Sequence, residues 1–264
     1  MMAGAFYESL GGGAFAATPA TGGPWSPAFQ HAGPVAGLIG RAFERHDPVL
    51  GTRVARVTLE ILGPVPVAEL RVDVRTVRPG KRVALLEAEL SHEGRPVVRA
   101  TAWRTLRAPG HVPTVVHAPA PPAFPESPTD FGAWDGAHMD GYLSAMEWRL
   151  AEGTFLGPGP GTVWARSRVP LVAGEEDSPL VRALVLSDSA SGIGSQLDLA
   201  KWQIVNTDLT VSLHRDPAGG WLCLSGAVHV SGGGSGLCEG RLADASGPFG
   251  LVTQTMFVDE QPSA

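Results

Sequence analysis

Hydrophobic residues in the first half of the chain change from helical spacing to strand spacing. Apolar residues recur at intervals of three and four between Val35 and Phe43, which predicts an amphipathic helix. Pro34 suits the first turn of this helix. The helix should end before Asp47–Pro48, because the residue before a proline is biased away from helical geometry. Alternating apolar and polar residues then predict four strands, over residues 53–62, 68–77, 83–92 and 96–106.

The same order of elements returns after residue 140. Two short strands are predicted first, over residues 146–150 and 161–171. A helix from Ser178 to Asp188 follows, in which Ser178 is a good N-cap and Pro179 occupies the first helical position. Further strands are predicted over residues 202–215, 221–231, 236–243 and 249–258. A helix followed by several antiparallel strands, occurring twice, predicts an α+β fold.

A proline-dense stretch separates the two halves. Residues 107–135 are weakly periodic, which is typical of a linker. We therefore expect an N-terminal domain over residues 1–108, a Pro-rich linker over 109–140 and a C-terminal domain over 141–264. The linker should extend over the surface, where four of its apolar residues could dock: Val115, Val116, Phe124 and Phe131.

Composition and charge argue against several classes of function. The chain has 264 residues, of which 44% are hydrophobic, and a formal net charge of −6. No run of Lys and Arg is longer than two residues, so no nucleic-acid partner is expected. No apolar run reaches the roughly 18 residues that a membrane span needs. The N-terminus lacks a basic segment followed by a long apolar core, so we expect a cytoplasmic protein without a secretory signal.

Cysteine and histidine spacing favours neither a disulfide nor a metal site. Cys223 and Cys238 lie on neighbouring predicted strands. Without an export signal, two reduced thiols are favoured over a disulfide between them. The chain has no CxxC motif, no HExxH motif and no pair of histidines on one face. We therefore expect no metal and no other cofactor.

The segment from Leu184 to Arg215 places polar residues inside an apolar pattern. Asp188 ends the second predicted helix, where a carboxylate faces the negative end of the helix dipole. Strand alternation puts Asn206 and Asp208 on one face of the sheet and Thr207 on the other. A carboxylate near amide groups indicates a reactive pocket. The alternatives are a surface aspartate that opens a loop and a polar pair that hydrogen-bonds the loop backbone.

Short motifs follow one another along both halves of the chain. In the first half they are Trp25, His31-Ala32-Gly33-Pro34, residues 75–82 and Glu93-Gly94-Arg95. In the second half they are Ser187-Asp188, residues 206–210, His214-Arg215, Trp221 and residues 249–254. Each motif is loose by itself. Their ordered combination, over nearly the whole chain, resembles the double hot-dog acyl-CoA thioesterases of the acyl-CoA thioesterase II type.

The resemblance implies a fold and a ligand. The fold would be two fused hot-dog domains, each a long helix packed on a curved antiparallel sheet, with the two sheets joined into one. The ligand would be acyl-CoA or another acyl thioester. Because a double hot-dog chain already mimics the usual dimer, we expect a monomer or a homo-oligomer of such chains.

The resemblance also implies three catalytic residues. An aspartate at the place of Asp188 activates water against the thioester carbonyl. The family has Thr or Ser at the place of Asn206, and an amide there can position water but cannot supply a hydroxyl. Gln254 would complete the set, although a Gln254 that faces solvent is the alternative. The first hypothesis is therefore hydrolysis of acyl-CoA by a water held by Asp188, Asn206 and Gln254, without a covalent intermediate.

Weaker candidates for substrate binding surround these three residues. An oxyanion hole needs backbone N–H groups that approach the substrate closely, which glycine permits. The candidates are His31, Gly33, Thr207, Gly192 and Gly194.

Two other functions stay open. His31 and Asp188 are placed like the His–Asp pair of the fused hot-dog dehydratases of polyketide synthases, which remove water from a 3-hydroxyacyl thioester. The glycine and proline spacing after His31 differs from that family. Asn206 in place of a hydroxyl residue also fits a non-catalytic acyl-binding module.

Overall fold

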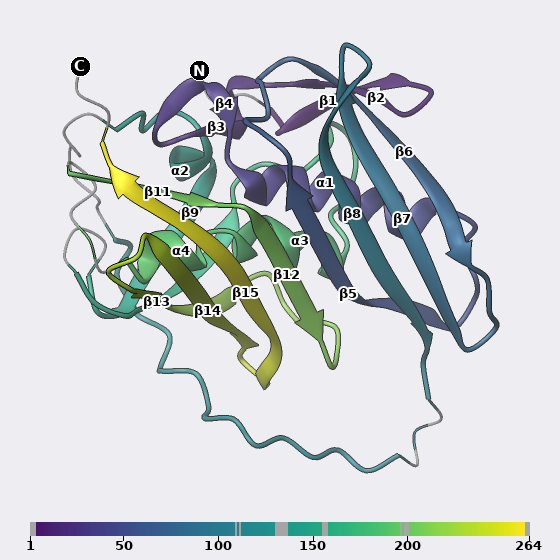
Figure 1. Cartoon of the computed structure of the whole chain (residues 1–264). Coiled ribbons are helices and arrows are strands. Elements are labelled where there is room, and N and C mark those ends of the chain that lie inside the picture. Colours follow the sequence, from purple (N-terminus) through teal and green to yellow (C-terminus); the bar gives the residue numbers. More distant parts are fainter. Residues whose placement is uncertain are drawn as a thin grey trace.

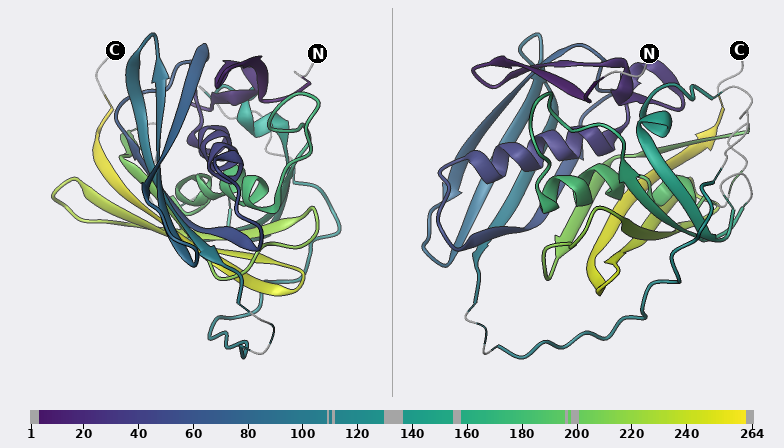
Figure 2. Two further views of the ribbon diagram at one scale, coloured as in Figure 1. Left: turned by 90° about the vertical axis from the view of Figure 1, so that its right-hand side faces the viewer. Right: turned by 180° about the vertical axis from the view of Figure 1, so that it is seen from behind.

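One antiparallel sheet curves around two central helices (Figure 1). The computed structural model describes residues 4–108, 110, 112–129, 137–154, 158–195, 197 and 201–261. Within these residues the main sheet has 13 strands. The two central helices are α1 (Ala32–Arg45) and α3 (Pro179–Ser187), which lie side by side on the concave face of the sheet (Figure 2).

The first half of the main sheet has the order β1-β2-β6-β7-β8-β5. Its strands are β1 (Tyr7–Gly11), β2 (Ala14–Ala17), β5 (Thr52–Ile61), β6 (Glu69–Arg78), β7 (Val83–His92) and β8 (Arg95–Leu106). The last four agree with the four predicted strands to within one residue at each end. A short 3-10 helix (Pro19–Thr21) and a separate two-stranded ribbon, β3 (Gly22–Gly23) and β4 (Ser26–Gln30), precede α1.

The second half continues the same sheet in the order β12-β15-β14-β13-β10-β9, with β11 paired to β15. Its strands are β9 (Met146–Glu152), β10 (Gly161–Ser167), β11 (Trp202–Asn206), β12 (Asp208–Leu213), β13 (Leu222–Val230), β14 (Ser235–Asp244) and β15 (Gly247–Glu260). Two short helices, α2 (Tyr142–Ala145) and α4 (Ala190–Ile193), flank it. Antiparallel pairing of β5 with β12 joins the halves, which is the arrangement expected of two fused hot-dog domains.

Each central helix begins at a side chain that caps it. His31 precedes α1, and its ring nitrogen Nδ1 accepts the backbone N–H of Gly33. Ser178 precedes α3, and its hydroxyl accepts the backbone N–H of Val181, as predicted for an N-cap followed by proline. Close contact between the helices requires a glycine, because a Cβ on Gly33 would lie 2.2 Å from the carbonyl oxygen of Val185. The start of α1 is therefore held against the end of α3.

The hydrophobic core fills the space between the helices and the sheet. Leu38, Ile39 and Phe43 of α1 are fully buried there. The sheet contributes every second residue of its strands, as Val252 and Met256 of β15 show. Burial of one such side chain stabilises the fold by about 1.5–3 kcal/mol. The alternating pattern of the sequence therefore marks the concave face of the sheet correctly in these strands.

A β-bulge breaks the predicted strand over residues 202–215 into β11 and β12. Asn206 pairs with Met256 and Thr210 pairs with Thr253, so three residues oppose two on β15. The extra residue reverses the alternation of faces. Asn206 therefore points to the concave side, whereas Asp208 is on the outer side and accepts the backbone N–H of Thr255. The expectation that Asn206 and Asp208 share a face is wrong.

The middle of the predicted linker, at residues 124–126, docks on the outer face of the sheet. The ring of Phe124 packs edge-on against Trp164 and Trp221, at centroid distances of 5.5 and 4.9 Å. Arg149 lies over the Phe124 ring and donates to the carbonyl oxygens of residues 125 and 126. Val115 is 69% exposed and does not dock. Phe131 lies outside the described residues, and the division at residues 108 and 140 stays a prediction.

The two cysteines are free and buried, on β13 and β14. Burial is the main reason that the pKa of the Cys223 thiol rises to about 12, and the same holds for Cys238. The prediction of two reduced thiols therefore agrees with the structure. None of the helices in the described ranges is long and apolar enough to cross a membrane.

Candidate active site

A buried carboxylate lies where the end of α3 meets the start of α1. Asp188 is the C-cap of α3 and is 4% exposed. The carboxylate faces the negative end of α3, as the sequence indicates. It also faces the positive end of the longer helix α1, since its Oδ2 lies 3.1 Å from Nδ1 of the N-cap His31. The dipole of α1 offsets the unfavourable position at the end of α3.

Two amide side chains hold the other carboxylate oxygen. Nδ2 of Asn206 and Nε2 of Gln254 each donate to Oδ1 of Asp188, both at 2.9 Å. Asn206 reaches Asp188 because the bulge after β11 turns it to the concave side. Gln254 lies in the buried row of β15 and is 0% exposed, so the alternative of a solvent-facing Gln254 is wrong. The structure therefore brings the amides of Asn206 and Gln254 to the carboxylate of Asp188, so the three predicted residues lie together.

One oxygen of this cluster is left without a donor. Oε1 of Gln254 is buried and has no hydrogen-bond partner among the described residues. A buried acceptor without a partner is uncommon and destabilises the fold. The amide nitrogen of Gln254 donates to Asp188, which leaves the amide oxygen Oε1, an acceptor only, without a partner among these residues. A molecule that donates a hydrogen bond, such as water, matches this position.

The contacts of His31 with Gly33 and with Asp188 need different protonation states of its ring. Nδ1 lies 3.1 Å from the backbone nitrogen of Gly33 and 3.1 Å from Oδ2 of Asp188. An unprotonated Nδ1 accepts from Gly33, whereas a protonated Nδ1 donates to Asp188. Burial lowers the pKa of His31, and the nearby charge of Asp188 partly opposes this. The choice between the two states decides whether the N–H of Gly33 is free.

Two aromatic rings stack on His31. Tyr142 stacks on the imidazole at a centroid distance of 3.8 Å and an interplanar angle of 12°, and Trp25 lies at 5.7 Å and 25°. The Tyr142 hydroxyl donates to the carbonyl oxygen of Val185, which ties the ring to α3. Burial raises the pKa of this hydroxyl. Sequence patterns gave no signal for Tyr142, because residues 142 and 31 meet only through the tertiary fold.

Three of the weaker candidates lie elsewhere or are already hydrogen-bonded. Thr207 is exposed, and its hydroxyl donates to the backbone carbonyl of Thr255. Gly192 is exposed within α4. The N–H of Gly194 donates to Ala190 within α4, so it has no donor to offer as an oxyanion hole. His31 and Gly33 are the two weaker candidates that the structure places at Asp188.

The side chains of this cluster are of the kinds that take part in proton transfer. Across the described ranges, no group of three or more His, Cys, Asp and Glu side chains is arranged to hold a metal ion. A carboxylate fixed by two amides and flanked by an imidazole can accept a proton from water. The start of α1 supplies a partial positive charge beside it.

Comparison with protein families gives a match in each half of the chain. A model of the acyl-CoA thioesterase N-terminal domain matches residues 21–105, and a model of the acyl-CoA thioesterase C-terminal domain matches residues 117–258. Comparison with curated proteins gave no match.

Solved structures with similar folds cover nearly the whole chain. An acyl-CoA thioesterase II from Mycobacterium marinum superposes with a TM-score of 0.68 at 17% identity, over 98% of this chain and 96% of that chain. A conserved protein with a hot dog fold from Alicyclobacillus acidocaldarius superposes with a TM-score of 0.74 at 18% identity, over 99% and 98%. At such low sequence identities the superpositions show the fold alone, and they confirm the predicted hot-dog fold.

Proposed function

We propose that this chain, which belongs to the acyl-CoA thioesterase family and is a thioester hydrolase, hydrolyses acyl-CoA with a water held by Asp188, Asn206 and Gln254. One observation carries the proposal: the amides of Asn206 and Gln254 both donate to the same oxygen of Asp188. This fixes the carboxylate and leaves its other oxygen, beside His31, to face a water. Preorganisation of this kind removes the need to orient the base during the reaction.

The reaction would proceed without a covalent acyl-enzyme. Asp188 takes one proton from the water while the water oxygen attacks the carbonyl carbon of the thioester. Oε1 of Gln254, the buried acceptor without a partner, would hold the second proton of that water. The tetrahedral intermediate then collapses, the carbon–sulfur bond breaks, and the sulfur leaves as a thiolate that takes up the proton held by Asp188. The products are a carboxylic acid and a free thiol.

Gly33 is the proposed donor to the developing oxyanion. When Nδ1 of His31 carries a proton and donates it to Asp188, the N–H of Gly33 has no acceptor on His31. That N–H belongs to the first turn of α1, where the helix dipole favours negative charge. The thioester carbonyl oxygen would then accept from Gly33 as charge builds up on it.

A dehydratase is the second candidate, because the structure brings together the residues it would need. Nδ1 of His31 lies 3.1 Å from Oδ2 of Asp188. In this alternative the pair would remove water from a 3-hydroxyacyl thioester. The two amides on Asp188 favour hydrolysis instead, since they orient the carboxylate toward a water.

Thiol release from a panel of acyl-CoA substrates tests the proposal. Asp188→Asn should lower kcat by about 10²–10⁴-fold, the usual contribution of a general base. Asp73→Asn is the matched control, because Asp73 is an exposed aspartate on the outer face of β6. Thiol release that survives both Asp188→Asn and Gln254→Ala would overturn the assignment.

The same panel separates the alternatives. Loss of water from 3-hydroxyacyl-CoA that disappears in His31→Ala, without thiol release, would identify a dehydratase. Saturable acyl-CoA binding with neither reaction would identify an acyl-binding module.

A further inference from the structure

The two halves of the sheet contain the same bulge at equivalent places. In the second half Asn206 pairs with Met256 and Thr210 with Thr253. In the first half residue 54 pairs with 104 and residue 58 pairs with 101. Each of the four residues in the second half lies 152 positions after its counterpart in the first half, as residue 206 does after residue 54. This equivalence locates the counterpart of the candidate active site at the other end of the helix pair.

That counterpart lacks the groups needed for hydrolysis. By the same offset, Val54 occupies the position equivalent to Asn206, and Ala102 occupies the position equivalent to Gln254. At the end of α1 the C-cap is His46, where α3 has Asp188. Two apolar side chains and an imidazole cannot fix a carboxylate toward water. This end of the helix pair therefore has the same backbone arrangement as the candidate active site, but it lacks the carboxylate and the two amides.

A cavity of about 230 Å³ occupies this counterpart position. Val54 lines it, together with Pro179 and Leu180 from the start of α3. Ser178, the N-cap of α3, donates its hydroxyl to Glu44 near the end of α1 at 2.6 Å. The helix ends therefore meet here as they do at Asp188, with the roles of α1 and α3 exchanged.

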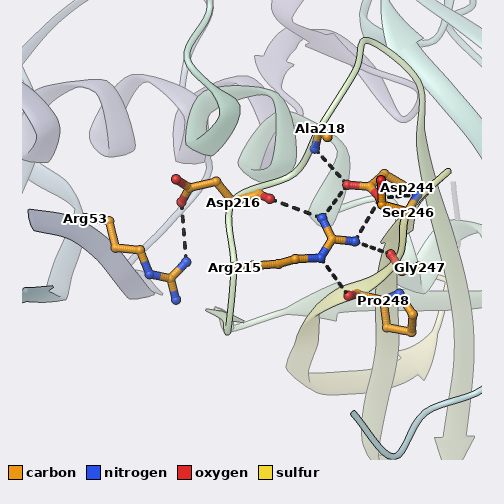
Figure 3. A network of polar contacts seen from close by, with 8 residues as sticks. All are labelled: Arg53, Arg215, Asp216, Ala218, Asp244, Ser246, Gly247 and Pro248. Carbon is orange, nitrogen blue, oxygen red and sulfur yellow. Dashed lines mark hydrogen bonds and ion pairs between the residues drawn. The ribbon is translucent and has the colours of Figure 1, made fainter. Parts of the chain in front are cut away.

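Three arginines and two carboxylates line the cavity, which leaves one net positive charge: Arg53, Arg104, Arg107, Glu44 and Asp216. Asp216 takes both Arg53 and Arg107 as ion-pair partners, and Figure 3 shows the first of these pairs. Burial raises the pKa of Glu44, while the hydrogen bond from Ser178 opposes the rise.

Arg104 differs from the other two arginines of this cavity because it is buried and, in the part of the chain that the structure describes, lacks a carboxylate partner. It is 7% exposed and forms no ion pair with a carboxylate among the described residues. Its Nη1 donates to the backbone carbonyls of His46 and Asp47, at 2.8 and 2.9 Å, which caps the end of α1. A guanidinium has five N–H donors in a planar fork, so its other donors can serve a ligand. A buried cation without an anionic partner is unfavourable, and an anion would relieve this.

We propose that this cavity is a second, non-catalytic ligand site that binds a small oxyanion, a carboxylate or a phosphate, between Arg104, Arg107 and the start of α3. Guanidinium groups bind both kinds of oxyanion through paired N–H donors. The apolar wall at Val54 and Leu180 has room for a short hydrocarbon beside the charged group. The site does not depend on the proposed hydrolysis, because none of its residues contacts Asp188.

Calorimetric titration of the full chain tests this site. The probes are inorganic phosphate, which carries the charge alone, and octanoate, which adds an apolar tail. We expect one saturable site per chain for at least one probe, and the probe that binds identifies the source of the anion. Arg107→Gln and Arg104→Gln should each weaken binding by about tenfold or more, as expected for loss of a charge-assisted hydrogen bond.

Two control variants separate this site from the surface and from the active site. Arg99→Gln removes an exposed arginine of the same sheet and should leave binding unchanged, as should Asp188→Asn. Because Arg104 also caps α1, circular dichroism must show that Arg104→Gln is folded, and the partly exposed Arg107 provides the variant without a capping role. Absence of saturable binding for both probes overturns the proposal. So does binding that Asp188→Asn abolishes and Arg107→Gln leaves intact.

Discussion

Asp244→Asn should destabilise the fold strongly at neutral pH and much less in acid. Asp244 is fully buried at the turn between β14 and β15, and it accepts four hydrogen bonds (Figure 3). Two come from the Arg215 guanidinium at 2.6 and 2.8 Å, and two from the backbone N–H groups of Ala218 and Ser246, both at 2.7 Å. This network lies at the turn into β15, the strand that carries Gln254 and pairs with Asn206 of β11.

The size of the effect follows from the burial of this pair. Breaking a buried ion pair by removing one charge costs about 3–5 kcal/mol. Arg215 is 30% exposed, so solvent screens it in part, and we expect about 3 kcal/mol. In a chain of this size that corresponds to a fall in Tm of about 6–12 °C.

The direction of the pH dependence follows from the pKa of Asp244. Burial alone would raise this pKa, but the hydrogen bonds from Arg215, Ala218 and Ser246 outweigh burial and lower it. A lowered pKa in the folded state adds stability above the unfolded-state value of about 3.9, and that stability is lost as the pH falls further. The difference between the wild type and Asp244→Asn should therefore shrink below about pH 4.

Urea denaturation at pH 7 and at acidic pH measures this difference. Asp73→Asn is the control, since Asp73 is 63% exposed and its pair with Arg71 lies at the surface. The control should change the free energy of unfolding by less than about 1 kcal/mol. A destabilisation by Asp244→Asn that is equal at both pH values would refute the reasoning, because it would owe nothing to the carboxylate charge.

Three further changes test the candidate active site. Gln254→Met should lower kcat for thioester hydrolysis by about 10²–10³-fold, as loss of a preorganised polar group does, while circular dichroism shows an unchanged fold. His31→Phe should gain stability relative to the wild type as the pH falls below about 6.5. Burial lowers the pKa of His31 in the folded state, so protonation of this histidine favours the unfolded wild type. Thermal melts of both proteins across about pH 5–8 measure this difference in stability. Gly33→Ala should lower the free energy of unfolding by about 1–3 kcal/mol, since its Cβ would lie 2.2 Å from the carbonyl oxygen of Val185; urea melts that match the wild type would contradict this.

Sequence patterns predicted the scaffold well because most of it obeys simple periodicity. Strands β5 to β8 lie within one residue of their predicted bounds, since each alternates between core and solvent over most of its length. Helix α3 begins after the predicted cap Ser178. Alternation breaks where a bulge adds a residue, between Asn206 and Thr210 and again in β5 between Val54 and Thr58. Nothing in the sequence around Asn206 marks that extra residue.

The candidate site was predictable only in part. Asp188 stood out by itself as a carboxylate at the wrong end of a helix, whereas Asn206 and Gln254 were joined to it through the family resemblance. Periodicity could not indicate that the start of α1 would offset the position of Asp188, because that depends on how α1 crosses α3. Tyr142 was missed for the same reason, since it reaches His31 from a segment far away in the chain.

The two ends of the helix pair separate what the scaffold provides from what the side chains provide. At each end a capped helix start meets the end of the other helix, and a bulged strand turns one side chain toward the junction. With Asn206 and Gln254 beside a carboxylate, this geometry can hold a base toward water. With Val54 and Ala102 at the same places it cannot, although the backbone is equivalent. The bulge is therefore a property of the fold, and the difference in chemistry between the ends depends on the few side chains that face each junction.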